Sequence, residues 1–146
     1  LLEKRRELAM NDVAILRDSG IYQTLAELKR EGKIRAFGLS GKTIAGGLLA
    51  LEQGDCAMVT YNLAEQGEKP VLDYAAAHSK GILIKKALAS GHACLAGQDP
   101  VRASFELLFG HPGVSSAIVG TINPQHLAAN VATAAAVIRD YTAQLR

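Results

Sequence analysis

The feature of this sequence that most constrains its fold is the alternation of short apolar runs with longer segments of helical periodicity. The apolar runs are IRAFGL (34–39), AMVTYNL (57–63), GILIKKAL (81–88) and SSAIVGT (115–121). They show no clean alternation of apolar and polar residues, which is typical of strands buried on both faces. Strands that alternate with helices indicate βαβ units, so the sequence predicts an α/β fold of four units with parallel strands.

The segments between these runs carry the start and stop signals of helices. We expect helices over 22–32, 43–54, 69–81 and 99–113, and a last helix that begins at Pro124. Gly32 and Gly81 are predicted to end the first and the third of them. Asp99 and Asn123 each precede a proline and are predicted N-caps. This spacing suits an open doubly wound sheet as well as half of an eight-stranded barrel.

Composition indicates one globular domain and excludes several classes of partner. The 146 residues are 49% hydrophobic and 21% charged, with a net charge of +2 and no basic cluster interleaved with aromatic residues. We therefore expect no nucleic-acid partner. No apolar run approaches the ~18–20 residues of a membrane span, so we expect no membrane partner. Cys56 and Cys94 have no close cysteine partner, which predicts reduced thiols in a cytoplasmic protein.

In parallel α/β folds, ligands bind where the strands end and the following turns begin. The turns at the four predicted strand ends are GLSGKT (38–43), TYNL (60–63), KKALASGH (85–92) and GTINP (120–124). Backbone amides beside small residues suit a phosphate, above all where a helix begins. GTINP meets this description best, although the same pattern is also common in ordinary loops.

GLSGKT is similar to the end of a nucleotide-binding P-loop, but the pattern is incomplete. That loop requires a glycine five residues before Gly41, and the residue there is Ala36. Asp55 and Asp73 have no partner that resembles a glycosidase carboxylate pair. We therefore expect neither a P-loop nor a carboxylate pair.

Lys85 and Lys86 extend an apolar strand at its carboxyl end. One of two neighbouring strand residues should point into a barrel or cleft, where a lysine can bind an anion, act as an acid or base, or form an imine. The alternative is that both side chains reach solvent at the strand end.

The four histidines fall into two pairs. His92 follows the Ser90-Gly91 turn and His126 lies one turn into the last helix, so both could meet a phosphate. His78 and His111 lie beside helix ends, where structural or solvated positions are expected. No spacing of His and Cys indicates a metal site, and none is predicted.

Taken together, these strand ends resemble the aldo-keto reductase family. The matching stretches are LKREGKIRAFGLSG (28–41), GILIKKALASG (81–91) and HPGVSSAIVGTINPQHLAANV (111–131). Members of this family are eight-stranded β/α barrels with NADPH laid across the strand ends. The resemblance implies that residues 12–146 are the C-terminal half of a TIM-type barrel, units five to eight. Residues 1–11 do not match the family and are expected to form a helical extension.

The resemblance also implies the residues at the nicotinamide end of the cofactor. Ser40 matches the serine that hydrogen-bonds the nicotinamide carboxamide, and Gly41 replaces the asparagine that usually follows it. Met58 replaces a glutamine that binds the same amide. Lys85 stands where members of the family stack an aromatic ring on the nicotinamide, so it is a candidate replacement contact.

At the phosphate end, the resemblance implies a loop and the start of the last helix. The loop that wraps the pyrophosphate is matched by Leu88, Ala89, Ser90 and Gly91. Thr121 matches the residue that binds the 2′-phosphate, and Asn130 matches an asparagine that meets the adenine. His126 replaces an arginine. Gly120 replaces a lysine that would add about 1.5–3 kcal/mol, so NADP is expected but NAD is possible.

The catalytic tetrad of the family (Asp, Tyr, Lys, His) comes from strands that precede residue 12, so no catalytic residue is assigned here. Our first hypothesis is that the chain is the cofactor-binding half of an NAD(P)H-dependent oxidoreductase, either as part of a full enzyme or paired with a second half-barrel. The second is a non-catalytic half-barrel that self-associates and has residual or no nucleotide binding. Because a half-barrel exposes edge strands and apolar interior, we expect a homo-oligomer or a second half-barrel as partner.

Overall fold

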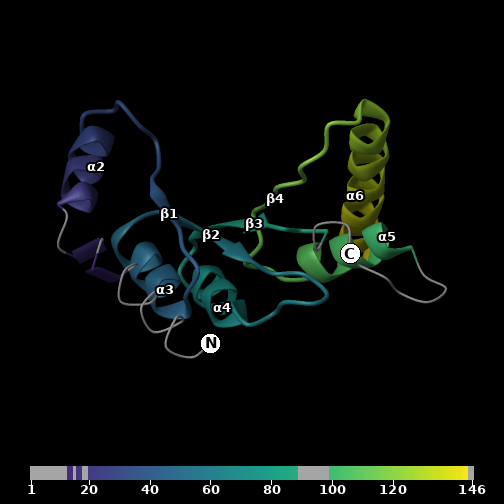
Figure 1. Cartoon of the computed structure of the whole chain (residues 1–146), viewed down its shortest axis with the longest axis horizontal. Coiled ribbons are helices and arrows are strands. Elements are labelled where there is room, and N and C mark those ends of the chain that lie inside the picture. The colour runs from purple at the N-terminus through teal and green to yellow at the C-terminus, as the bar shows by residue number, and fades with distance from the viewer. Residues whose placement is uncertain (1–12, 15, 18–19, 89–98, 145–146) are drawn as a thin grey trace.

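The computed structural model describes residues 13–14, 16–17, 20–88 and 99–144. Within them, four parallel strands form one sheet, in the order β1 (Gly38–Ser40), β2 (Cys56–Thr60), β3 (Gly81–Lys85) and β4 (Ser116–Ala117) (Figure 1). A doubly wound sheet reverses its strand order at a switch point, whereas the strands of a barrel follow the order of the sequence. The observed order confirms the α/β fold and is that of half a barrel.

All four predicted strands are shorter than expected, and the second ends at Thr60 and not at residue 63. The first begins at Gly38 and not at residue 34, and the third ends at Lys85 because the backbone of Lys86 turns with a φ of 55°. The fourth was expected over 115–121 and comprises only Ser116–Ala117. It is the last strand of the sheet that the described residues form, so none of them pairs with its outer edge to hold the chain extended, and Ile118 is 42% exposed.

The expectation that the strands are buried on both faces is wrong. Along β2 and β3, buried residues alternate with half-buried ones. Ala57 and Val59 of β2 and Ile82 and Ile84 of β3 are almost completely buried, because they face the helices. Their neighbours in the sequence point to the opposite side of the sheet, which the described helices do not cover. This open face corresponds to the interior of a barrel.

Within residues 20–88 and 99–144, five helices accompany the sheet, and their ends follow local signals. They are α2 (Ile21–Arg30), α3 (Ile44–Gln53), α4 (Lys69–Ala77), α5 (Pro100–Phe109) and α6 (Pro124–Gln144). The predicted caps are confirmed: the Asp99 side chain accepts hydrogen bonds from the first turn of α5, and Asn123 does so for α6. Gly32, with a φ of 73°, follows the end of α2 as expected.

The predicted end of α4 at Gly81 is wrong. The helix ends at Ala77, and Ser79 adopts a left-handed φ of 54° in the turn that follows. Gly81 is instead the first residue of β3. The expected extension over residues 1–11 lies outside the described residues.

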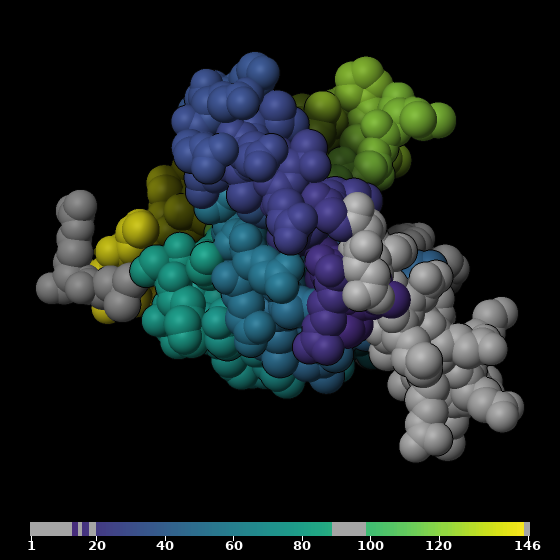
Figure 2. All heavy atoms as spheres, turned by 90° about the vertical axis from the view of Figure 1, so that its left-hand side faces the viewer, coloured from purple at the N-terminus to yellow at the C-terminus, as the bar shows by residue number. Residues whose placement is uncertain are grey.

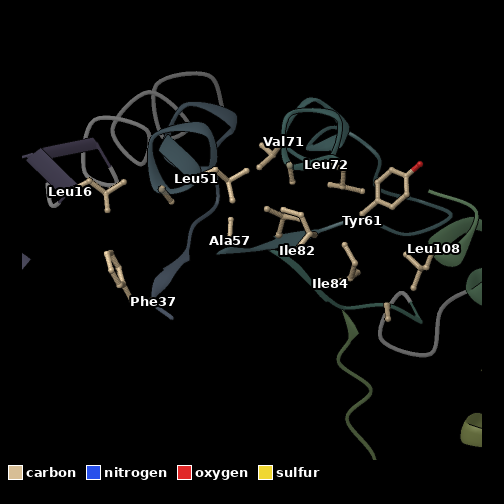
Figure 3. Packing of buried hydrophobic residues seen from close by; sticks show 14 of the residues in the cluster. Leu16, Phe37, Leu51, Ala57, Tyr61, Val71, Leu72, Ile82, Ile84 and Leu108 are labelled. Atoms are coloured by element: carbon tan, nitrogen blue, oxygen red, sulfur yellow. The ribbon is translucent and has the colours of Figure 1, made fainter. Parts of the chain in front are cut away.

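The hydrophobic core lies between the covered face of the sheet and α3 and α4. Leu51 of α3 and Val71 and Leu72 of α4 are completely buried against Ala57 and Ile82 (Figure 3). Because buried apolar surface stabilises a fold by about 25 cal/mol for each square ångström, this layer stabilises the folded chain. The same side chains hold β2 and β3 flat against the two helices.

At the end of the chain, α6 packs beside α5 (Figure 1). Val137 is buried there, and the Tyr141 hydroxyl donates a hydrogen bond of 3.0 Å to the Glu106 carbonyl. Arg102 and Asp140 form an ion pair of 2.7 Å between the two helices. The light green segment between β4 and α6 projects from the body of the molecule (Figure 2). None of the described helices has the length and hydropathy needed to cross a membrane.

Asp55, between α3 and β2, joins three parts of the fold. Its carboxylate accepts hydrogen bonds from Lys29 of α2 and from the Phe37 amide. Burial acts to raise its pKa, but these two hydrogen bonds and the charges of Lys29 and Lys80 outweigh burial and hold the pKa below the usual value. The ionised form of Asp55 therefore stabilises the folded chain.

We predict that Gly38→Ala destabilises the chain by about 3 kcal/mol, the upper part of the range for overpacking. A Cβ atom at this position would lie 1.8 Å from the Cys56 carbonyl oxygen, so β1 could not stay paired with β2. Urea unfolding measures the change. The control is Gly67→Ala, because nothing lies within 4 Å of the position of a Cβ atom on that exposed glycine. Equal stability of the two variants would contradict the prediction.

We predict that Asp55→Asn lowers stability by about 1 kcal/mol at neutral pH. Because folding lowers the pKa of Asp55, its contribution is complete above the unfolded value of ~3.9 and is lost as pH falls through the folded value. In unfolding experiments, the difference in the free energy of unfolding between Asp55→Asn and wild type should therefore be constant above about pH 5 and shrink below about pH 4. Glu52→Gln, at an exposed position of α3, is the control and should show no such difference. A difference for Asp55→Asn that does not shrink as pH falls below about 4 would refute this assignment.

Candidate functional site

A hollow of about 820 Å³ lies at the carboxyl ends of β3 and β4. Its walls come from the chain that follows β3, from the start of α5, from the segment after β4 and from the first two turns of α6. We call it the β3–β4 hollow. It is lined by Lys85, Lys86, Ala87, Leu88, Val101, Ile118, Val119, Gly120, Thr121, His126, Ala129 and Asn130.

The start of α6 forms one wall of this hollow, and its geometry follows from the sequence GTINP. The Asn123 side chain accepts hydrogen bonds from the amides of Gln125 (2.9 Å) and His126 (3.4 Å). The Asn123 amide in turn donates to the Thr121 hydroxyl at 3.2 Å. These bonds fix the turn, while the Thr121 and His126 side chains remain exposed. The positive end of the α6 dipole lies at this wall, where it favours an anion.

Gly120 leaves this wall open. Nothing lies within 4 Å of the position that a Cβ atom would take there. Asn130, in the second turn of α6, is half-buried and also lines the hollow. A larger residue at position 120 would therefore have room.

Lys85 lies on the open face of the sheet, at the end of β3. Its Nζ donates hydrogen bonds to the Gly41 carbonyl oxygen (2.5 Å) and the Ser40 Oγ (3.4 Å), across the neighbouring strand β2. Lys86, in contrast, is exposed, and its Nζ lies 3.8 Å from a carboxylate oxygen of Glu65. The interpretation that one of the two lysines points over the interior is correct, and that lysine is Lys85.

Six of the nine predicted contact residues line the hollow, namely Lys85, Leu88, Gly120, Thr121, His126 and Asn130. Ser40 is joined to the group through its bond with Lys85. Ser90 and Gly91 lie outside the described residues, as do Ala89, His92 and Cys94. Met58 lies directly beside Ser40 in the register of β1 and β2.

The other candidate residues have structural contacts. His78 stacks on Tyr74 of α4, with ring centroids 3.9 Å apart. His111 accepts a hydrogen bond from the Gly113 amide and donates from Nε2 to Asp73 at 3.0 Å. Hydrogen bonds from Lys69 and then His111 hold the pKa of Asp73 below its usual value. The described residues contain no group of three His, Cys, Asp or Glu side chains that could hold a metal ion.

The P-loop resemblance of GLSGKT has a simpler structural basis. Thr43 is the N-cap of α3, and its hydroxyl accepts a hydrogen bond of 3.1 Å from the Gly46 amide. Gly41 is buried and its carbonyl oxygen points to Lys85. The turn therefore caps α3 and accepts a hydrogen bond from Lys85.

Sequence analysis missed Asn62, which is 2% exposed. Its side chain accepts from the amides of Ala64 and Glu65 and donates to the Lys86 carbonyl oxygen at 3.1 Å. Asn62 thus fixes the turn after β2 and the left-handed turn at Lys86 together. The signal was its place two residues after the end of a strand, where an Asn side chain commonly bonds to the backbone that follows.

Comparison with known proteins supports this reading of the fold. No family model and no curated protein matches the sequence. Two solved structures from Pseudomonas aeruginosa, each titled as a "putative aldo-keto reductase", are similar to the chain with 66% and 65% sequence identity. Their TM-scores are 0.79 and 0.78, and in each case 88% of this chain is covered.

The chain spans about half the length of these relatives, 48% of one and 47% of the other. The shared half agrees with the sequential order of four parallel strands and with a sheet that is covered on one face. An identity near two thirds far exceeds what a shared barrel architecture alone requires. Over the half of the barrel that it spans, the chain is closely similar in sequence and fold to these two aldo-keto reductase structures.

Proposed function

We propose that the chain is the cofactor-binding half of an oxidoreductase in which a hydride passes between NADPH, or NADH, and a carbonyl compound. The observation that carries the proposal is the β3–β4 hollow, which brings together residues 85–88 and the start of α6 although they are far apart in the sequence. Its volume of about 820 Å³ lies in the range of cofactor sites. The similarity to two structures titled as aldo-keto reductases supports the same reaction class.

The residues of the hollow suit the phosphate end of such a cofactor. The amino end of α6 favours an anion, and His126 can donate a hydrogen bond to one from its exposed ring. Thr121 offers a hydroxyl on the same wall, and Asn130 offers an amide for the adenine. In this proposal, Leu88 and the Ser90-Gly91 turn lie along the pyrophosphate.

The nicotinamide end would lie over the open face of the sheet, at Ser40. The bound cofactor supplies the hydride, and Ser40 orients the ring through the carboxamide. The proton donor comes from a part of the barrel that this chain does not span. We place the protein in the cytoplasm, which the free thiol of Cys56 supports.

A second candidate function is a half-barrel that self-associates without catalysis. The observation in its favour is a set of exposed apolar side chains after β4 and along α6: Ile118, Ile122, Leu127, Val131 and Ile138. Surfaces of this kind mark interaction sites in soluble proteins. The same surface would be covered by the other half of a complete barrel, so nucleotide binding separates the two candidates.

We predict that the chain binds NADPH with micromolar affinity and that replacement of Thr121 and His126 by Ala weakens binding at least about tenfold, or ~1.4 kcal/mol. Both side chains line the proposed phosphate site. Titration followed by NADPH fluorescence measures the affinity. Thr142→Ala is the control, because that hydroxyl bonds to its own helix at the far end of α6. No binding at millimolar cofactor, with self-association in sedimentation, would instead support the second candidate.

We predict that Gly120→Lys raises the affinity for NADPH about tenfold and leaves that for NADH nearly unchanged. A lysine there has room and adds one charge-assisted bond to the 2′-phosphate, which NADH lacks. Parallel titrations with the two cofactors measure the ratio. Gly120→Gln is the matched control for bulk without charge. An equal gain for both cofactors would show that position 120 does not face the 2′-phosphate.

A further inference from the structure

Lys85 links the two outer parts of the open face. It ends β3 and is paired in register with Thr60 of β2. Its Nζ nevertheless reaches past β2 to the carboxyl end of β1, where it donates to the Gly41 carbonyl oxygen and to the Ser40 Oγ. The contact therefore spans three strands and joins residues 44 and 45 positions apart in the sequence.

The carboxyl end of β1 needs such a contact. β1 has three residues, and its partner in the described sheet is β2 alone. Gly41 is buried, and the Lys85 ammonium donates a partly buried hydrogen bond to its carbonyl oxygen. A buried carbonyl left without a partner costs about as much as a lost hydrogen bond. Lys85 thus fixes the position of Ser40 and Gly41.

We propose that Lys85 is a positioning residue that holds Ser40 against the nicotinamide and that its charge makes the site prefer the reduced cofactor to the oxidised one. This inference rests on the proposed function. The ammonium donates to a lone pair of the Ser40 oxygen, which leaves the Ser40 hydroxyl proton free for the carboxamide oxygen. The hydroxyl is therefore oriented as a donor to the cofactor.

The preference for the reduced form follows from charge. The oxidised nicotinamide ring is a cation, whereas the reduced ring is neutral. An ammonium at the contact to the carboxamide repels the first and leaves the second unaffected. Because the two forms are otherwise nearly identical in shape, every other contact of Lys85 acts on both of them equally.

The experiment compares wild type with Lys85→Met, which removes the charge and both hydrogen bonds, and with Lys85→Arg, which keeps a cationic donor. Lys33→Met, an exposed lysine in the turn after α2, is the control for loss of one positive charge. Two quantities are measured on each chain: amide hydrogen exchange of residues 38–43 without cofactor, and the Kd values of NADPH and NADP⁺, the latter by displacement of NADPH.

We expect exchange of residues 38–43 to become at least about tenfold faster in Lys85→Met and to stay near the wild-type rate in Lys85→Arg and Lys33→Met. The ratio of the Kd for NADP⁺ to that for NADPH should fall about threefold to tenfold in Lys85→Met alone. A purely structural role would weaken both cofactors equally and leave the ratio unchanged, which would overturn the charge preference.

Failure of the positioning role of Lys85 and failure of the proposed function give different results. Unchanged exchange in Lys85→Met would overturn the positioning role whatever the cofactor does, since that measurement uses no ligand. If exchange rises but wild type binds neither NADPH nor NADP⁺, the proposed function is wrong and the preference falls with it. A ratio that falls equally in Lys33→Met would assign the effect to net charge and not to Lys85.

Discussion

The pairing of β2 with β3 is the constraint on which the rest of the structure depends. Five consecutive residues pair in register, and the side chains that point to one side form the core with α3 and α4. The same register decides which residues meet on the other side. It places Lys85 beside Thr60, one layer beyond Met58 and Ser40, and so brings a cation to the end of β1. The register of β2 and β3 therefore determines both the hydrophobic core and the candidate site.

One-sided cover is the physical mark of a half-barrel. In a closed barrel the inner faces of opposite strands fill the interior together, so half of the strands leave half of the interior open. Here the open face carries small or polar residues at several positions, among them Gly38, Ser40, Thr60 and Lys85. That composition tolerates exposure better than the apolar outer side would. The exposed apolar residues gather instead after β4 and on α6.

Much of this fold could be predicted from the sequence, because its signals are local. The caps at Asp99 and Asn123 and the stop at Gly32 depend on the residues within one turn, and the structure has all three. The length of a strand depends on the strands that pair with it, and the predicted strand lengths were wrong. β4 shrinks to two residues because it is the last strand of the sheet, which no local pattern can reveal.

The candidate site divides in the same way. The turn GTINP and the strand end at Lys85 could be singled out from composition and position, and the hollow contains parts of both. The bond between Lys85 and Gly41 could not be predicted, because it depends on the register of two strand pairs and on the reach of a flexible side chain. The bond from Asn62 to the Lys86 carbonyl oxygen, 24 residues away, could not be predicted for the same reason, whereas the bonds of Asn62 to Ala64 and Glu65 are local.

Compared with the residues that the resemblance implies, this chain carries less positive charge near the phosphate end of the proposed cofactor and more near its nicotinamide end. Where the resemblance expects a lysine at 120 and an arginine at 126, this chain has Gly120 and His126, and where it expects an aromatic ring it has Lys85. Less charge at the phosphate end weakens the discrimination between NADPH and NADH, because only the 2′-phosphate distinguishes them. More charge at the nicotinamide end strengthens the discrimination between reduced and oxidised forms. The site would thus discriminate more strongly between the reduced and the oxidised cofactor than between NADPH and NADH. This combination favours carbonyl reduction over the reverse reaction.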